Sequence, residues 1–524
     1  MKKIVLFGLF FFIINQSKAQ TDFITQYYGP TGNQIMYSSV SKNNAVYSVG
    51  NTDAFGSGLT DGLLLKTNLY GDTIFTKTYG GASNDEFRKV KFLHDGNLLM
   101  AGSTVSFSSY GAFDMNMMLV KTNLLGNVIW CKSINAAANQ IAIDFFENPD
   151  GSIIILGSTV SANIGGTDVC LVKISSTGDF IWSKSLGGTN DEVATSITNI
   201  SNSGYIISGH TKSFGLGAFY PFVLAVDTAG KFKWAKAYDN KYHPSSIVGN
   251  GNCITHGFLN DYIFVGKDGM GSVGDALPFV LSIDSLGNIN WDSEFVINTG
   301  DCAATSVITT ADHHYLIAGY MGNYYGLLFQ VDTTGHGVWI NNYNSAYKFF
   351  DCTETSNGYL TSGFSVVSSQ NQATLMSTDL SGTVYAGCYS PHIINTNSLS
   401  VTPIITSLAF SNDSAIYNTI DSCKVNSAPL SINKTCLSTP TSINQFNNST
   451  LNIYPNPAQK NFTVEVSNND KQQLQVLDIS GKIVLTQTIQ SKTTIDASMF
   501  ENGVYFIQLK SGAGVSMQKL VVQH

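Results

Sequence analysis

The sequence predicts an all-β protein, and three observations support this fold class. One turn-and-aromatic unit recurs seven times with a spacing of about 52 residues. Each unit holds roughly four short apolar stretches separated by Gly-containing turns, and no stretch has helical periodicity. A four-stranded sheet cannot bury both of its faces alone, so neighbouring copies must cover it. We therefore predict a seven-bladed β-propeller in residues 20–390 and a small Ig-like β-sandwich in residues 451–524.

A repeated turn defines the units. It places Asn, Ser or Asp three residues before a Gly, a spacing typical of a type I turn whose short side chain caps the backbone and whose Gly adopts a positive φ. Its seven copies are Asn68…Gly71, Asn123…Gly126, Ser175…Gly178, Asp227…Gly230, Asp284…Gly287, Asp332…Gly335 and Asp379…Gly382. Four positions after the Gly, six copies carry a large aromatic residue: Phe75, Trp130, Trp182, Trp234, Trp291 and Trp339. We interpret these aromatics as packing residues between blades rather than as a platform that stacks a ligand.

The segments that flank the units have predicted roles as well. Residues 22–29 resemble the strand in residues 74–80 and precede the first unit. We expect them to complete the last blade and close the ring, because the seventh copy carries Ala386 in place of the aromatic. Residues 391–437 contain β-branched patches and predict a strand-bearing extension of the last blade; an eighth blade is the alternative. Residues 438–450 read as a polar linker.

The N-terminus has the pattern of a secretory signal peptide, residues 1–19. Lys2 and Lys3 supply positive charge, an apolar run covers residues 4–14, and small residues precede a cleavage site after Ala19. Eleven helical residues are too short to cross a membrane core of about 30 Å. We expect export, and no transmembrane segment after removal of the signal.

Four motifs stand in order near the C-terminus: Tyr454-Pro455-Asn456-Pro457, Asp478-Ile479-Ser480-Gly481-Lys482, Asn502-Gly503-Val504-Tyr505-Phe506 and Lys519-Leu520-Val521-Val522. This stretch resembles the type A C-terminal sorting domain of Bacteroidetes type IX secretion cargo. The resemblance implies passage through that translocon by way of this domain, removal of the domain, and either surface attachment or release. The middle region is similar to propeller-type repeat regions of secreted Bacteroidetes proteins, a likeness that names no ligand.

The charge composition excludes one class of partner. The chain has 524 residues, 28 Lys and Arg against 36 Asp and Glu, and only 12% charged residues. Arg88 is its single arginine. Because a nucleic-acid surface needs clustered Lys and Arg, we expect no nucleic-acid partner.

No catalytic, cofactor-binding or metal-ligating residue is predicted, and no cofactor. Residues 269–274 match the dinucleotide pattern, but a strand rather than a helix is expected after them. The similar acidic loops in residues 80–86 and 187–192 are interpreted as turn caps, although a Ca²⁺ site would be sought there first. His313 and His314 fall at a predicted hairpin tip.

The eight cysteines contain no Cys-x-x-Cys pair, which argues against zinc. Disulfides are permitted in an exported protein. Cys423 with Cys436 is the first pair to test, and Cys388 with either of them is the alternative.

Three functions fit these observations. The first is an exported, non-enzymatic propeller at the cell surface or released from it, which binds a glycan or protein partner through one face. The second is a polysaccharide lyase or glycosidase with carboxylates converging on the central channel. Residues 238–246 are the one departure from the repeat that gathers acid, His and Tyr, and Asp239 and His243 would carry that reaction. The third is a structural component of the surface without a soluble ligand. The sequence leaves open the ligand and the face that binds it.

Overall fold

The computed structural model describes residues 23–29, 32–108, 114–135, 139–160, 165–201, 203–213, 219–239, 250–269, 276–295, 301–322, 325–344, 348–384, 389–391, 404–408, 411–413, 418–420, 424–427, 430–434, 451–466, 472–478, 482–511 and 514–524. The chain divides into two compact units, residues 1–438 and 439–524. The predicted signal peptide, the polar linker and the side chains of Cys388, Cys423 and Cys436 lie outside the described residues.

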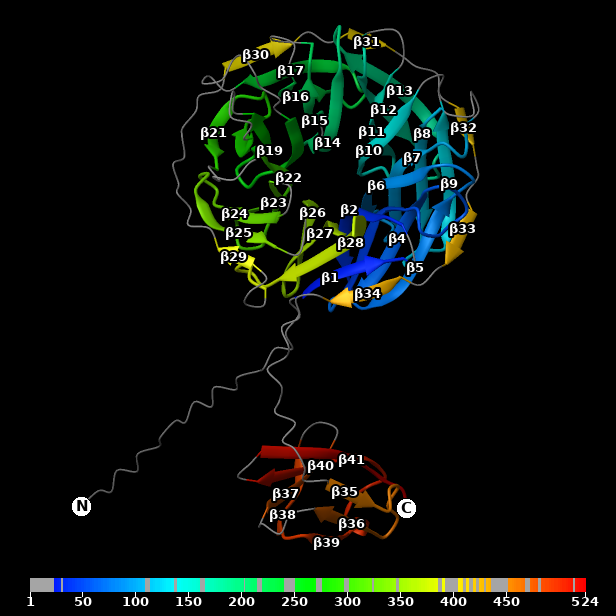
Figure 1. Ribbon diagram of the computed structural model, residues 1–524, viewed down its shortest axis with the longest axis vertical. Coiled ribbons are helices and arrows are strands. Elements are labelled where there is room, and N and C mark those ends of the chain that lie inside the picture. Colours follow the sequence, from blue (N-terminus) through cyan, green and yellow to red (C-terminus); the bar gives the residue numbers. More distant parts are fainter. Residues whose placement is uncertain are drawn as a thin grey trace, which may run out of the picture. The chain divides into compact units, whose positions relative to one another are not determined.

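The first unit is built from seven antiparallel sheets arranged around a common centre (Figure 1). Sheet 1 contains β2 (Gln34–Lys42), β3 (Ala45–Thr52), β4 (Asp61–Asn68) and β5 (Thr73–Gly80). Sheet 2 contains β6 (Asp85–Phe92), β7 (Leu98–Thr104), β8 (Asn116–Thr122) and β9 (Val128–Asn135). Sheet 3 contains β10 (Gln140–Glu147), β11 (Ile153–Thr159), β12 (Asp168–Ile174) and β13 (Phe180–Gly187).

The remaining four sheets repeat this order. Sheet 4 contains β14 (Glu192–Ile200), β15 (Gly204–Thr211), β16 (Tyr220–Val226) and β17 (Phe232–Asp239). Sheet 5 contains β18 (Asn250–His256), β19 (Tyr262–Gly269), β20 (Ala276–Ile283) and β21 (Ile289–Glu294). Sheet 6 contains β22 (Cys302–Thr309), β23 (Tyr315–Met321), β24 (Tyr325–Val331) and β25 (Gly337–Tyr343). Sheet 7 contains β26 (Lys348–Thr355), β27 (Gly358–Val367), β28 (Gln370–Thr378) and, from the start of the chain, β1 (Phe23–Tyr28).

The expected closure by the N-terminal segment is confirmed. β1 pairs antiparallel with β28, with Phe23 opposite Ser377 and Tyr27 opposite Ala373. Seven apolar clusters fill the junctions between neighbouring sheets, and the cluster between sheets 7 and 1 includes Phe23 and Tyr27. The architecture is therefore all-β and propeller-like, with the core divided among the junctions of the ring.

The predicted turn geometry and aromatic packing are also confirmed. The Gly of each of the seven turns has a positive φ, such as +75° at Gly230, and its N–H donates to the carbonyl three residues earlier. Trp182, half-buried, packs on the turn of the next sheet, since a Cβ added at Gly230 would lie 2.7 Å from its ring. At the last junction Phe23 packs in the same way on Gly71. The aromatic missing at Ala386 is thus supplied by β1.

Six short strands between residues 389 and 434 form a belt around the circumference of the ring (Figure 1). The belt consists of β29 (Tyr389–Pro391), β30 (Ile404–Leu408), β31 (Ser411–Asp413), β32 (Asn418–Ile420), β33 (Lys424–Ser427) and β34 (Ser431–Lys434). These strands pair in that order with β25, β17, β13, β9, β5 and β1. The belt therefore adds a fifth strand to six sheets. It passes sheets 6, 4, 3, 2, 1 and 7 in turn, which is the reverse of the order of the sheets along the chain.

The belt corrects the expectation that residues 391–437 extend the last blade. Only β34 joins sheet 7, while the other belt strands join sheets 6, 4, 3, 2 and 1. The belt strands pair with the ring and not with one another, so among the described residues they form no eighth sheet. The physical reason is that the outermost strand of each sheet has backbone N–H and C=O groups without a partner at its outer edge. A short segment that pairs there forms hydrogen bonds for its own backbone groups and for those of the edge strand.

The second unit has two sheets around one apolar core. The first contains β35 (Leu451–Tyr454), β36 (Asn461–Val466) and β39 (Lys492–Asp496), and the second contains β38 (Ile483–Ile489), β37 (Gln472–Leu477), β40 (Gly503–Ser511) and β41 (Gly514–Val522). A short 3-10 turn, Ala497–Met499, is the only helical element in the described part of the chain. No helix there is long and apolar enough to cross a membrane.

Candidate functional site: the loop face and the central channel

The two faces of the ring differ in the length of their connections. The antiparallel order places the first-to-second strand turns of all seven sheets and the third-to-fourth strand turns of sheets 1–6 on one face, the turn face, and none of these turns exceeds five residues. The opposite face, the loop face, carries the second-to-third connections and the passages between sheets. These vary from residues 368–369 to residues 105–115. Variable connections on a regular scaffold are where binding residues usually lie, which makes the loop face the candidate binding surface.

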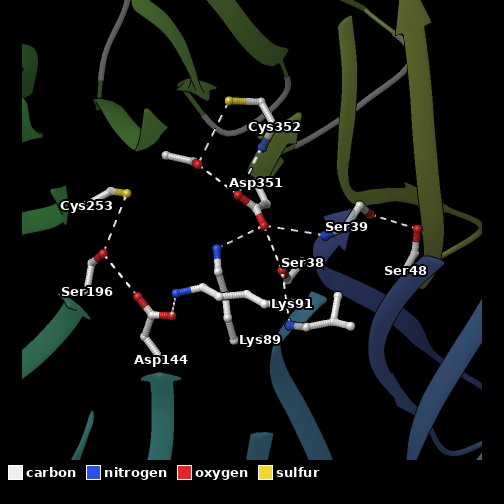
Figure 2. A network of polar contacts seen from close by, with 12 residues as sticks. Ser38, Ser39, Ser48, Lys89, Lys91, Asp144, Ser196, Cys253, Asp351 and Cys352 are labelled. Carbon is white, nitrogen blue, oxygen red and sulfur yellow. Dashed lines mark hydrogen bonds and ion pairs between the residues drawn. The ribbon is translucent and has the colours of Figure 1, made fainter. Parts of the chain in front are cut away.

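Every innermost strand contains a bulge at the same level of the channel, such as that between Phe87 and Lys89 in β6. The residue after each bulge belongs to a set that we name the channel ring: Ser38, Lys89, Asp144, Ser196, Cys253, Ser306 and Asp351. Figure 2 shows side chains of this set pointing toward one another across the centre. One polar residue per sheet therefore fills the channel at this level.

Two ion pairs hold the channel ring together. Lys89 Nζ lies 3.0 Å from Asp351 Oδ2, and Lys91 Nζ lies 2.6 Å from Asp144 Oδ1 (Figure 2). Burial opposes the charge of Lys89, but Asp351 and Asp144 raise its pKa above the ordinary range. Burial likewise opposes the charge of Asp144, yet Lys91 and Lys89 keep its pKa below the usual value. The pKa shifts of Lys89 and Asp144 therefore both favour the charged form of the side chain.

Both carboxylates also accept hydrogen bonds from serine hydroxyl groups and from the backbone. Ser38 Oγ donates to Asp351 Oδ2 at 2.7 Å, and Ser306 Oγ donates to Asp351 Oδ1 at 2.8 Å. Ser196 Oγ and the backbone N–H of Ile197 donate to Asp144 Oδ2. A carboxylate whose oxygens are all occupied by donors from the protein is poorly placed to exchange a proton with a substrate. The polar groups of the channel ring thus form their hydrogen bonds and ion pairs within the protein, and we call this layer the polar plug.

An aromatic–ionic cluster lies on the loop-face side of this plug. It consists of Tyr37, Glu86, Arg88, Phe350 and Phe364. The Arg88 guanidinium carbon lies 4.3 Å from the centre of the Tyr37 ring, and Arg88 Nη2 lies 2.7 Å from Glu86 Oε1. The Tyr37 and Phe350 ring centres are 5.2 Å apart, and Phe350 stacks on Phe364. Each of these side chains keeps part of its surface exposed.

Sequence reasoning missed this cluster although it noted that Arg88 is unique. Tyr37, Arg88 and Phe350 are the bulged residues of β2, β6 and β26. A bulged residue has no partner on the neighbouring strand, so its side chain is released from the alternation of the sheet. Burial raises the pKa of the Tyr37 hydroxyl, while Arg88 lowers it and Glu86 raises it further. Tyr37 is therefore a neutral hydrogen-bonding group beside a cation.

The acidic loops act as turn caps, as predicted. Asp85 Oδ2 accepts hydrogen bonds from the Gly81 N–H and from Ser106 Oγ, both at 2.7 Å. At the corresponding place Glu192 accepts from the Gly188 N–H at 2.6 Å. Asp85 and Glu192 are equivalent because each begins an innermost strand.

A second carboxylate faces each of these caps across a junction. Asp168 is fully buried beside Glu192, and neither of its oxygens has a hydrogen-bond partner in the described structure. Burial, Glu192 and then Asp191 raise the pKa of Asp168 to about 7. Asp61 is placed similarly beside Asp85, and burial raises its pKa too. These pairs escaped the sequence analysis because a lone Asp before an apolar strand looks like an ordinary turn residue.

The remaining sequence candidates do not assemble into a site. The dinucleotide-like residues 269–274 begin at the end of β19 and precede the antiparallel strand β20; residues 270–275 themselves lie outside the described residues. His313 is exposed at a turn with a φ of +62°. Residues 240–249, which include His243, are not described, nor is the side chain of Asp239. Over the described ranges, no three His, Cys, Asp or Glu side chains are grouped to hold a metal ion.

Comparison with known proteins identifies the second unit. Residues 452–523 match the model of the secretion system C-terminal sorting domain. This domain marks the chain as cargo of type IX secretion, and it indicates export to the cell surface or beyond. No curated protein matches the chain.

Several solved structures resemble the chain at low identity. An α-L-arabinofuranosidase from Fusarium graminearum with an iminosugar inhibitor is 8% identical, and the match covers 69% of this chain and 98% of that chain with a TM-score of 0.36. A complex of an α-L-arabinofuranosidase from that organism with arabinobiose is 9% identical, with 69% and 99% covered and a TM-score of 0.35. An extracellular domain from B. thetaiotaomicron is 8% identical, with 98% and 75% covered and a TM-score of 0.25.

Proposed function

We propose that the protein is an exported seven-bladed β-propeller that binds a glycan or protein partner at its loop face without catalysing a reaction. In this proposal residues 20–390 form the propeller, the belt fastens it, and an Ig-like sorting domain in residues 451–524 delivers it through the type IX translocon. The observation that carries the proposal is the contrast between the two faces, with variable connections surrounding the aromatic–ionic cluster on one of them.

The charge arrangement in the channel supports binding over hydrolysis. Glycoside hydrolysis requires a carboxylic acid with a raised pKa beside a second carboxylate, with the substrate between them. Asp351 and Asp144 are instead fixed in ion pairs. Asp168 has a raised pKa, but it is fully buried at a junction and no polymer reaches it. Glu294, whose pKa burial and Asp268 raise to about 8, lies on β21, the outermost strand of sheet 5, and not at the central channel.

A paired screen of the full secreted chain tests the proposal. We expect capture of at least one glycan or protein from arrays and no release of reducing ends from the same polysaccharides. Arg88→Ala and Tyr37→Ala are expected to weaken capture, whereas His313→Ala, on the turn face, serves as the control. Turnover of a polysaccharide that is abolished by Asp239→Asn or His243→Ala would instead establish the lyase or glycosidase.

A further inference from the structure

A notch of about 250 Å³ opens on the turn face between sheets 3 and 4. Its lining residues come from five short segments of sheets 2, 3 and 4: His94, Phe146, Glu147, Asn148, Pro149, Asn199, Gly204, Tyr205 and Thr228. Pockets for drug-sized ligands usually measure about 300–1,000 Å³, so this notch suits something smaller, such as one sugar ring.

The polar groups of the notch are partly fixed and partly free. Glu147 Oε2 accepts from the His94 N–H at 2.7 Å, and Asn199 Oδ1 contacts His256 Nε2 at 2.7 Å. Tyr205 Oη donates to Asn148 Oδ1 at 2.7 Å. Within the described structure, Glu147 Oε1 and Asn199 Nδ2 make no hydrogen bond. The notch therefore offers one charged acceptor and one amide donor on side chains that are already oriented.

The apolar side of the notch is aromatic. Phe146 is half-buried and its ring centre lies 6.1 Å from that of Tyr205, which is itself almost fully buried. This contact fixes Phe146 while part of its surface stays exposed. A ligand in the notch thus contacts the apolar ring of Phe146 on one side and the free groups of Glu147 and Asn199 on the other.

These groups select among ligand classes. None of the nine lining residues is Lys or Arg, which disfavours an anion. A small amine would pair with Glu147 but would leave the donor of Asn199 facing a second donor. Neighbouring hydroxyls on a sugar ring satisfy both, because one donates to the carboxylate while the other accepts from the amide. The C–H face of the same ring can lie against Phe146.

We infer that this notch binds a neutral saccharide unit. The inference does not rest on the proposed function, because the notch lies on the opposite face from the aromatic–ionic cluster. It assigns Glu147 and Asn199 as the hydrogen-bonding residues and Phe146 as the apolar wall.

The chain itself offers a matched control. Glu354 stands three residues after Asp351 of the channel ring, as Glu147 stands three residues after Asp144. Glu354 Oε2 accepts from the Ala311 N–H at 3.0 Å, just as Glu147 Oε2 accepts from His94. Glu354 lines no part of the notch. Glu354→Gln therefore makes the same chemical change at the same structural position without altering the notch.

Saturation-transfer difference NMR on the full secreted chain tests the inference with D-glucose, D-galactose, D-mannose and N-acetyl-D-glucosamine, and with ethanolamine as an amine probe. We expect at least one sugar to bind the unaltered protein and the Glu354→Gln variant equally. The affinity for that sugar should fall at least tenfold in Glu147→Gln and in Asn199→Asp. The second change removes the free donor but keeps the oxygen that contacts His256. Unchanged tryptophan fluorescence verifies that each variant is folded.

Three results would overturn the inference. They are the absence of binding by all four sugars, sugar binding that survives both substitutions, and ethanolamine binding that Glu147→Gln abolishes and Asn199→Asp preserves. Arg88→Ala and Tyr37→Ala are expected to leave sugar binding in the notch unchanged. Failure of the notch is therefore distinguishable from failure of the loop-face proposal.

Discussion

Replacing Asp168 by Asn should stabilise the ring at alkaline pH. Asp168 is fully buried beside Glu192, and its pKa is raised from 3.8 to about 7. A carboxyl whose pKa is higher in the folded than in the unfolded chain stabilises the fold fully below pH 4, and that stability is lost as the pH rises toward 7. The difference between the two values corresponds to a free energy on the order of 4 kcal/mol above pH 7. Asp168→Asn removes this loss.

Tryptophan fluorescence during urea unfolding measures the effect, because all five Trp residues lie in the ring. We expect the Asp168→Asn protein to unfold at higher urea than the unaltered protein at pH 8, by roughly 2 kcal/mol or more, and at similar urea at pH 4. The equivalent junction between sheets 2 and 3 carries the amides Asn116 and Gln140. There Asn116→Asp should introduce a stability loss that grows with pH. Equal destabilisation of Asp168→Asn at both pH values would refute the reasoning.

Three further perturbations test the packing of the ring. Trp182→Ala should lower the free energy of unfolding by about 2–4 kcal/mol in urea titrations, because it opens a cavity at a junction. Ile181, the exposed neighbouring residue, provides the control: Ile181→Ala should change the free energy of unfolding by no more than about 0.5 kcal/mol. Gly230→Ala should cost more than Gly96→Ala in the same assay. Both residues have a positive φ, but only at Gly230 would the new Cβ meet a neighbour, the Trp182 ring. Deleting residues 404–434 while keeping the sorting domain should expose outer strand edges and produce aggregates in light scattering; a monodisperse product would contradict this role of the belt.

The repeated elements could be predicted from the sequence because their signals are local. The Asx-to-Gly turns need only four consecutive residues, and Asn68 and Gly71 adopt the expected geometry. The replacement of the missing seventh aromatic could also be predicted, because residues 22–29 resemble the repeated strand in residues 74–80. In the turns the pattern and its structural consequence lie within a few residues of each other; for residues 22–29 the likeness to a repeated strand supplied the signal, although their partner β28 is distant in the chain.

The belt and the channel could not be predicted in the same way. Val425 of the belt lies opposite Tyr79, and nothing in a four-residue strand specifies a partner so distant in the chain. The bulge at Arg88 shifts the alternation of β6 by one residue without a Gly to mark it. Ser38 and Asp351 meet only because the ring closes.

Both ends of the folded ring are held in one place. β1 lies between β28 and β34, so the earliest described strand is clasped by the final strand of the belt. Loss of the sorting domain anywhere beyond Lys434 would leave this clasp untouched. An exopeptidase that digested the chain from either end toward the ring would meet β1 or β34, both hydrogen-bonded strands, which suits a protein that is exported from the cell.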